Sequence, residues 1–137
     1  MPPDRLVFLL KRAQVRVSDL AEPGLAALGV DGREFAVLSV FAAAPEPLSQ
    51  RDAAALLMID RTTMVALVDG LERRGLVERR GHPADRRKNT LVLTAEGTAV
   101  LERADAVAAE AEAQFLAPLG PDRADEFRSA LQLLRPY

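Results

Sequence analysis

The spacing of apolar residues along the chain predicts a mainly helical protein. Over most of its length, apolar positions recur every three or four residues, which places them on one face of an α-helix. The first such stripe consists of Leu6, Leu10, Ala13, Val17 and Leu20. Pro23-Gly24 then predicts a break or a bend, and residues 25–30 are interpreted as a short apolar connector.

A capping pair and a proline delimit the second predicted helix. Asp31 lies three residues before Glu34, and this spacing lets the two residues satisfy free N–H groups at a helix start. The helix continues with an apolar face and ends before Pro45, because proline lacks the N–H group that a helix interior needs.

Two more helices, joined by a tight turn, are expected next. Ser49 is the expected cap of a short helix over residues 50–57, and residues 58–59 form the turn. Asp60 caps the following helix, and Gly75 stops it. The apolar face of this last helix consists of Met64, Leu67, Val68 and Leu71.

A β-hairpin and two helices complete the expected architecture. Residues 76–80 and 89–93 have the composition of strands, with a glycine- and proline-containing loop between them. Thr94 caps a long helix, which breaks at residues 118–121. A last helix carries the stripe Ala124, Phe127, Leu131 and Leu134. The predicted fold class is therefore mostly α with a small β-hairpin (α+β).

The arrangement over residues 49–97 is typical of a DNA reader. In a helix-turn-helix, the second helix places its N-terminal residues against base edges. The free N–H groups at the start of the first helix favour phosphate. The hairpin adds a wing whose arginines are attracted to narrow minor grooves. The residues predicted to contact DNA are Ser49, Gln50, Arg61, Thr62, Thr63, Val65, Ala66, Arg86, Arg87 and Lys88.

Asp85 has a different expected role in the same hairpin. A carboxylate beside phosphate would be repelled, so Asp85 is interpreted as an ion-pair partner that positions a wing arginine. This interpretation places Asp85 within the wing but not against the DNA.

The distribution of charge changes the picture that the composition gives. The chain of 137 residues has a net charge of −2, which is unusual for a DNA binder. Residues 61–90 hold eight basic and four acidic residues, a net charge of +4, which leaves −6 for the remainder. A basic patch on an acidic body is an electrostatic footprint of nucleic-acid binding. The alternative is a winged helix that binds protein, and such a module does not usually need five cations on one hairpin.

The sequence also argues against several other classes of function. The absence of cysteine excludes disulfides, thiolate zinc sites and thiol-based redox sensing. No signal peptide or bilayer-length apolar run is visible, so a cytoplasmic protein that does not bind membranes is expected. His82, the one histidine, lacks an obvious catalytic partner, and no glycine-rich phosphate loop occurs. We therefore expect no enzyme activity, no cofactor and no metal site.

The motifs resemble those of the MarR family of winged-helix regulators. The recognition helix is similar to DRTTMV at residues 60–65 and LERRGLV at residues 71–77. The wing signature is similar to DRR at residues 85–87 together with LTAEG at residues 93–97. The resemblance implies a homodimer that binds a pseudo-palindromic operator in double-stranded DNA, often as a repressor. It also implies release by a small, frequently aromatic ligand.

The resemblance further implies a ligand site where the dimerisation helices meet the winged domain. The matching residues here are Arg12, Arg16, Phe35, Leu38 and Phe41. From the residues alone, the alternative is that Phe35 and Leu38 are core and that the two arginines are solvated or ion-paired. The chain by itself therefore leaves the ligand site as an expectation of the family.

The chain divides into three expected parts. The first, fifth and sixth helices carry narrow apolar stripes that are typical of helix–helix seams. Periodicity does not distinguish packing within one chain from packing between two, but their position at opposite ends of the chain favours an intertwined homodimer. Residues 1–30 are the expected N-terminal dimerisation helix and connector, residues 31–97 the winged helix-turn-helix DNA-binding domain, and residues 98–137 the C-terminal dimerisation helices.

Three positions depart from the common pattern of the family. Met58 stands where such turns usually carry glycine, and a left-handed conformation there would cost on the order of 1 kcal/mol. Val65 and Ala66 stand where many members carry threonine and arginine. This removes two polar groups from the expected base-reading surface, so specificity is expected to depend more on residues 61–63 and on the wing.

Overall fold

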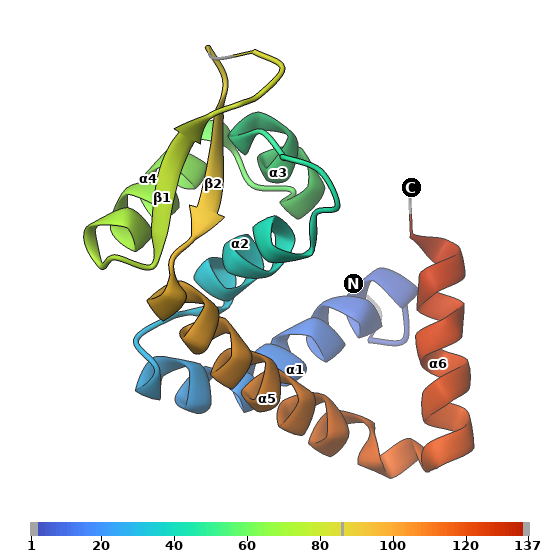
Figure 1. Ribbon diagram of the computed structural model, residues 1–137. Helices are drawn as coiled ribbons and strands as arrows, with labels where there is room; N and C mark the ends of the chain where they lie inside the picture. Colours follow the sequence, from blue (N-terminus) through green and yellow to red (C-terminus); the bar gives the residue numbers. More distant parts are fainter. Residues whose placement is uncertain (1–2, 86, 136–137) are drawn as a thin grey trace.

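A computed structural model describes residues 3–85 and 87–135. In the described part, α1 and α5 pack against each other, and α6 turns back from the end of α5 and stands apart from the wing (Figure 1). Within residues 3–85 and 87–135, no helix has the length and apolar character to cross a membrane. The elements are α1 (Leu6–Ala27), α2 (Gly32–Ala43), α3 (Gln50–Leu57), α4 (Arg61–Arg73), β1 (Val77–Gly81), β2 (Asn89–Leu93), α5 (Ala95–Leu116), η1 (Ala117–Leu119) and α6 (Pro121–Leu134).

The first helix does not break where the sequence predicted. Of the break or bend expected at Pro23-Gly24, the break is wrong, and the connector expected over residues 25–30 begins only after Ala27, because α1 continues to that residue. The continuation is favoured by packing, since Leu25 in the last turn is buried in the core. Gly24 lies so close to α5 that a Cβ atom there would be 2.6 Å from Cγ1 of Val107. Glycine therefore allows a close approach of the two helices instead of ending the first.

Three helices end with the same hydrogen-bond motif. At the end of α4, the N–H of Leu76 donates to the carbonyl of Leu71, and the N–H of Gly75 donates to the carbonyl of Glu72. This Schellman motif needs a left-handed residue, which Gly75 supplies with φ of 73°. The end of α1 uses Gly29 in the same way, with φ of 80°. At the end of α3 the left-handed residue is Met58, with φ of 54°.

Met58 is thus a glycine position occupied by a larger residue, as the sequence suggested. Its side chain points into solvent, with 89% exposure. The left-handed backbone costs about 1 to 2 kcal/mol for a residue with a Cβ atom. The Schellman bonds of the turn, in which Ile59 donates to Ala54, offset this cost.

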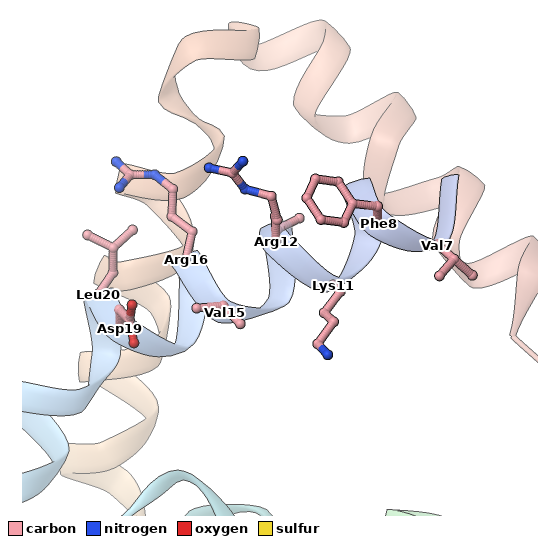
Figure 2. A pocket seen from close by; sticks show the side chains of 9 residues that line it. Val7, Phe8, Lys11, Arg12, Val15, Arg16, Asp19 and Leu20 are labelled. Atoms are coloured by element: carbon pink, nitrogen blue, oxygen red, sulfur yellow. The ribbon is translucent and has the colours of Figure 1, made fainter. Parts of the chain in front are cut away.

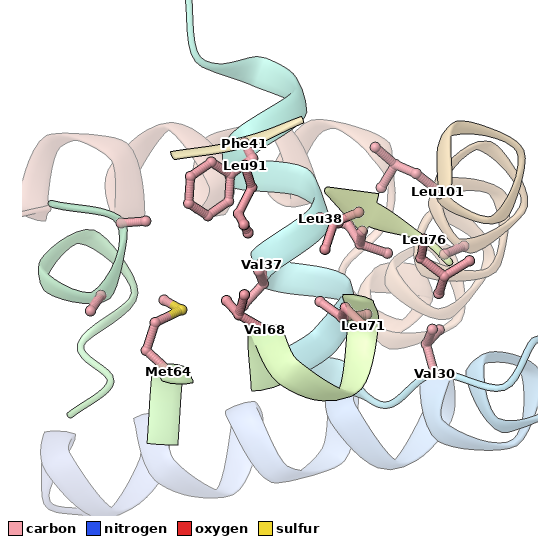
Figure 3. Packing of buried hydrophobic residues seen from close by; sticks show 14 of the residues in the cluster. Val30, Val37, Leu38, Phe41, Met64, Val68, Leu71, Leu76, Leu91 and Leu101 are labelled. Atoms are coloured by element: carbon pink, nitrogen blue, oxygen red, sulfur yellow. The ribbon is translucent and has the colours of Figure 1, made fainter. Parts of the chain in front are cut away.

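The hydrophobic core is built around α2. Val37 and Leu38 have no exposed surface, and α2 contacts α1, α3, α4, α5 and β2. Figure 3 shows Val68 and Leu71 of α4 beside Val37 of α2. The predicted apolar face of α4 is confirmed, with Leu67 at its partly buried edge. Other core residues come from beyond residues 31–97, so one core crosses the expected boundaries: Leu25, Val30, Leu101 and Ala104.

The two strands form an antiparallel hairpin that is attached to the helices at both ends. Val77 pairs with Leu93 at the base, and Gly81 pairs with Asn89 toward the tip. Near the tip, Thr90 also bridges to Ser49, and its hydroxyl donates to the carbonyl of Leu48 at 2.5 Å. A two-stranded hairpin is only marginally stable by itself, so these bonds to the segment before α3 help to hold it.

The LTAEG segment fixes the start of α5 to the end of α4. The hydroxyl of Thr94 accepts the N–H of Gly97 at 3.0 Å and donates to the carbonyl of Gly75 at 2.6 Å. Gly97 lies directly against the carbonyl of Leu76, and a Cβ atom there would be 1.9 Å from that oxygen. Only glycine fits this contact between two backbones.

We expect Gly97→Ala to destabilise the protein by about 2 to 3 kcal/mol, because the added methyl must push two backbone segments apart. Urea unfolding at one fixed protein concentration measures the change. Gly32→Ala is the matched control, since it also lies in the first turn of a helix and an added Cβ there meets nothing within 4 Å. The control should change stability by less than about 0.5 kcal/mol. Equal effects of the two substitutions would contradict the close-contact explanation.

Candidate DNA-binding surface

The start of α4 is held by the side chain of Asp60. The Asp60 carboxylate accepts the N–H of Thr63 at 2.8 Å and the hydroxyl of Thr63 at 2.7 Å. These bonds from Thr63 hold the pKa of Asp60 below its ordinary value. The charged cap therefore stabilises the helix start, which the sequence predicted.

The burial of one face of α4 determines which residues face outward. Thr62, Val65 and Ala66 are exposed on the side away from α2. Thr63 is half-buried, lines a cavity on the α1 and α2 side, and its hydroxyl already donates to Asp60. This arrangement favours a capping role for Thr63 over the base contact that the sequence suggested.

A groove lies between α3, the start of α4 and the hairpin. We call it the wing groove; its volume is about 210 Å³. It brings together six of the residues predicted to contact DNA, although they come from three separate elements. Arg86, which was also predicted to contact DNA, lies outside the described residues. The lining residues are Ser49, Gln50, Arg51, Ala54, Arg61, Met64, Val65, Arg87, Lys88 and Asn89.

Two polar residues in the wing groove differ in what they offer a ligand. Ser49 is only 2% exposed, and its hydroxyl accepts the N–H of Asp52 at 3.0 Å, so it caps α3. The side-chain nitrogen of Gln50 is buried and has no hydrogen-bond partner in the described part of the chain. A buried donor without a partner is costly, so the Gln50 amide keeps a donor that no described residue satisfies.

Asp85 orients Arg87 at the tip of the hairpin. The Arg87 guanidinium donates to the Asp85 carboxylate at 3.1 and 3.3 Å, and the Arg87 N–H donates to it at 3.0 Å. These bonds lower the pKa of Asp85. The Arg87 side chain is 91% exposed, so the ion pair orients the cation while leaving it open to solvent.

His82 has a role that the sequence did not indicate. Its Nε2 lies 2.9 Å from the carbonyl of Pro47, and its Nδ1 accepts the N–H of Ala84 at 3.1 Å. The ring therefore links the loop of the hairpin to the segment before α3. No local pattern signals this contact, since His82 and Pro47 are 35 positions apart.

Two arginines of the basic segment are turned toward carboxylates. Arg74 forms an ion pair with Glu34 and donates to the carbonyl of Gly29, which ties the end of α4 to the start of α2. Arg79 lies between Asp69 and Glu72 of α4. The hydrogen bond that the Arg79 guanidinium donates to the Asp69 carboxylate raises the pKa of Arg79. Arg74 and Arg79 thus form internal ion pairs, whereas Arg61, Arg87 and Lys88 line the wing groove.

The residues expected to bind a ligand lie in different environments. Figure 2 shows Phe8, Arg12 and Arg16 on one side of α1, where they line an open groove of about 910 Å³. The Arg12 guanidinium lies 5.7 Å from the centre of the Phe8 ring. Phe35 lines a second cavity, of about 730 Å³, between α1, α2, α5 and the turn before α4. Leu38 and Phe41 are in the core and line neither cavity.

The sequence and fold of this chain are similar to those of known DNA-binding regulators. Residues 28–88 match the MarR family. The repressor CouR bound to a 23-mer DNA duplex is 36% identical, with a TM-score of 0.85 over 96% of this chain and 92% of that chain. CouR from Rhodococcus jostii RHA1 bound to p-coumaroyl-CoA is 33% identical, with a TM-score of 0.83 over 98% of this chain and 94% of that chain.

A curated relative is also similar over most of the chain. The putative transcriptional regulatory protein for the hcr operon of Thauera aromatica is 32% identical over 83% of this chain and 69% of that protein. The chain belongs to the MarR family. The family consists of winged helix-turn-helix transcription regulators and not of enzymes. The repressor YetL of Bacillus subtilis is 35% identical over 64% of this chain, and the matched region spans 53% of the length of YetL.

For this MarR-family chain, Arg87→Ala should weaken binding to all DNA sequences by a similar factor. A lost phosphate contact also lowers the slope of log affinity against log salt by about one unit per wing. Fluorescence anisotropy with a labelled duplex at several salt concentrations measures both effects. Arg103→Ala removes an exposed cation from α5 and is the control, which should leave both quantities unchanged. An Arg87 variant with wild-type affinity and slope would show that the wing does not contact phosphate.

Proposed function

We propose that this chain is a homodimeric transcriptional repressor that binds a pseudo-palindromic operator through α4 and the wing. The observation that supports it best is the wing groove, where Gln50, Arg61, Arg87 and Lys88 converge beside the exposed face of α4. Arginine can bind guanine through two hydrogen bonds, and threonine can bond to a base or offer its methyl to thymine. Arg61 and Thr62 are the proposed base readers, with Val65 and Ala66 as apolar contacts.

Exposed apolar side chains support the homodimer. Within the described residues, α6 has no buried residue, although it carries an apolar stripe. Clustered exposed apolar surface on a folded chain favours association with a partner. A second copy covering this surface would form a two-fold assembly. The residues in question on α1 and α6 are Leu6, Val7, Leu9, Leu10, Val15, Leu131, Leu133 and Leu134.

Selection of bound sequences from a random DNA pool tests the proposed function. Two recognition helices on one face of the duplex should enrich a palindrome with half-sites roughly 34 Å apart. The selection should be repeated at two salt concentrations, because phosphate contacts weaken as salt rises. Enrichment of a single unpaired half-site would contradict the dimer. No enrichment at either concentration would favour the alternative, a winged helix that binds protein.

We also propose that a small aromatic ligand releases the DNA by binding the cavity lined by Phe35. Its volume of about 730 Å³ lies in the range of small-molecule sites. Asp60 and Thr63 line it too, so a ligand there would contact the start of the recognition helix. The CouR structure with p-coumaroyl-CoA supports this thioester as the first compound to test, with its aromatic acyl part as the group that would enter the cavity.

Ala108→Phe should abolish the response to ligand without loss of DNA binding, because the larger side chain fills the cavity that Ala108 lines. p-Coumaroyl-CoA is added to the complex of each protein, wild type and Ala108→Phe, with the labelled selected duplex. Release of the DNA is followed as the loss of fluorescence anisotropy. Since coupling is reciprocal, DNA should lower the affinity for the ligand by the same factor by which the ligand lowers the affinity for DNA. Ala99→Phe, on the exposed side of α5, is the control that should keep the response. A response retained by Ala108→Phe would place the ligand elsewhere.

A further inference from the structure

We propose that Arg79 is a positioning residue for DNA binding, which holds the wing at a fixed angle to the recognition helix. This inference rests on the proposed function, since it concerns how α4 and the wing reach one duplex together. Counted from the sequence, Arg79 is one of five cations on the hairpin. In the structure, its side chain faces α4 and two carboxylates.

Three hydrogen bonds join Arg79 to α4. Its Nη2 donates to Oδ1 of Asp69 at 2.5 Å, and its Nη1 donates to Oε1 of Glu72 at 2.8 Å. Its backbone N–H donates to Oε2 of Glu72 at 3.2 Å. The Arg79 side chain is 26% exposed, compared with 91% for Arg87. The guanidinium is thus occupied on two sides and partly covered.

These bonds connect α4 with β1, which follows it after a short turn and also packs against it in the core. Residues 74–76 link α4 to β1, and a two-stranded hairpin is marginally stable in isolation. Asp69 and Glu72 are three positions apart on α4, so their side chains lie on the same side of the helix. A planar guanidinium held by both carboxylates fixes a direction as well as a distance. The strand that carries the wing is therefore oriented by α4 itself.

The same bonds remove an electrostatic conflict from the DNA-facing helix. Asp69 and Glu72 are exposed on α4, where a phosphate backbone would repel them. Arg79 compensates part of their charge, so its own charge is not free to bind phosphate. Arg79 thus differs from Arg87 in role, although both are arginines of the same hairpin.

The double variant Asp69→Asn/Glu72→Gln gives opposite expectations for two roles of Arg79. If Arg79 were an ordinary DNA cation, the loss of two negative charges would tighten binding to every duplex. If Arg79 positions the wing, affinity for the duplex selected from the random pool should fall about tenfold, because ordering a loosened wing costs free energy on binding. Binding to a random duplex of the same length should stay equal or tighten. Tighter binding to the selected duplex would overturn the proposal.

Glu78→Gln is the matched control for charge. Glu78 lies beside Arg79 on β1, its contact with Arg80 is 3.4 Å, and both side chains are about 60% exposed. This variant should bind both duplexes at least as tightly as the wild type. If it loses affinity for the selected duplex as the double variant does, the effect is not specific to the Arg79 contacts and the proposal fails.

Arg79→Lys separates positioning from phosphate binding. Lysine keeps the charge and binds phosphate well, but it cannot hold two carboxylates with a planar fork. Arg79→Lys should therefore lower the affinity for the selected duplex about tenfold, while the slope of log affinity against log salt stays unchanged. A slope reduced by about one unit per protomer in Arg79→Met would show a direct phosphate contact instead.

Hydrogen exchange of the wing amides tests the positioning without DNA. In the free protein, residues 77–81 should exchange faster in Asp69→Asn/Glu72→Gln than in the wild type or in Glu78→Gln, while the core helix α2 should not change. Unchanged exchange in the double variant would overturn the proposal. If the selection enriches no sequence, the proposed function fails, and this measurement still decides the role of Arg79.

Discussion

The burial of one face of α4 against α2 is the constraint on which the rest of the structure depends. The core around Val37 and Leu38 buries the apolar face of α4, which consists of Met64, Val68 and Leu71. Since a helix has only one rotation that buries this stripe, Thr62 and Ala66 must face outward. The Schellman motif at Gly75 ends α4, and from that end the chain enters the wing. The surface available to DNA is therefore a consequence of core packing.

The fold gives the cations of the chain two different roles. The chain is acidic overall, so a basic surface for DNA requires that cations be concentrated and not cancelled. Arg61, Arg87 and Lys88 line the wing groove. Arg74 and Arg79 instead form ion pairs that fasten α4 to α2 and to β1. Such exposed pairs contribute little stability singly, and their effect here is on orientation.

The two ends of α4 are related to α1 and α2 in different ways. Asp60 and Thr63 at its start line the cavity between α1, α2 and α5. At its end, Arg74 donates to the carbonyl of Gly29 in the α1–α2 connection. A change in the packing of α1 therefore has two direct routes to the helix that is proposed to read DNA. This is the physical basis on which a ligand in the cavity would alter the position of α4.

The sequence by itself determined the local structure. Helix starts at Ser49, Asp60 and Thr94, the helix over residues 50–57 and the strand over residues 89–93 all follow from caps, turns and periodicity, which act between near neighbours. Only the tertiary structure decided the continuation of α1 through Pro23 and the partners of Arg74, Arg79 and His82. Packing against α5 outweighs the local preference of Pro23-Gly24 for a break. The contacts of the three side chains join residues between 7 and 45 positions apart, and only the fold brings those residues together.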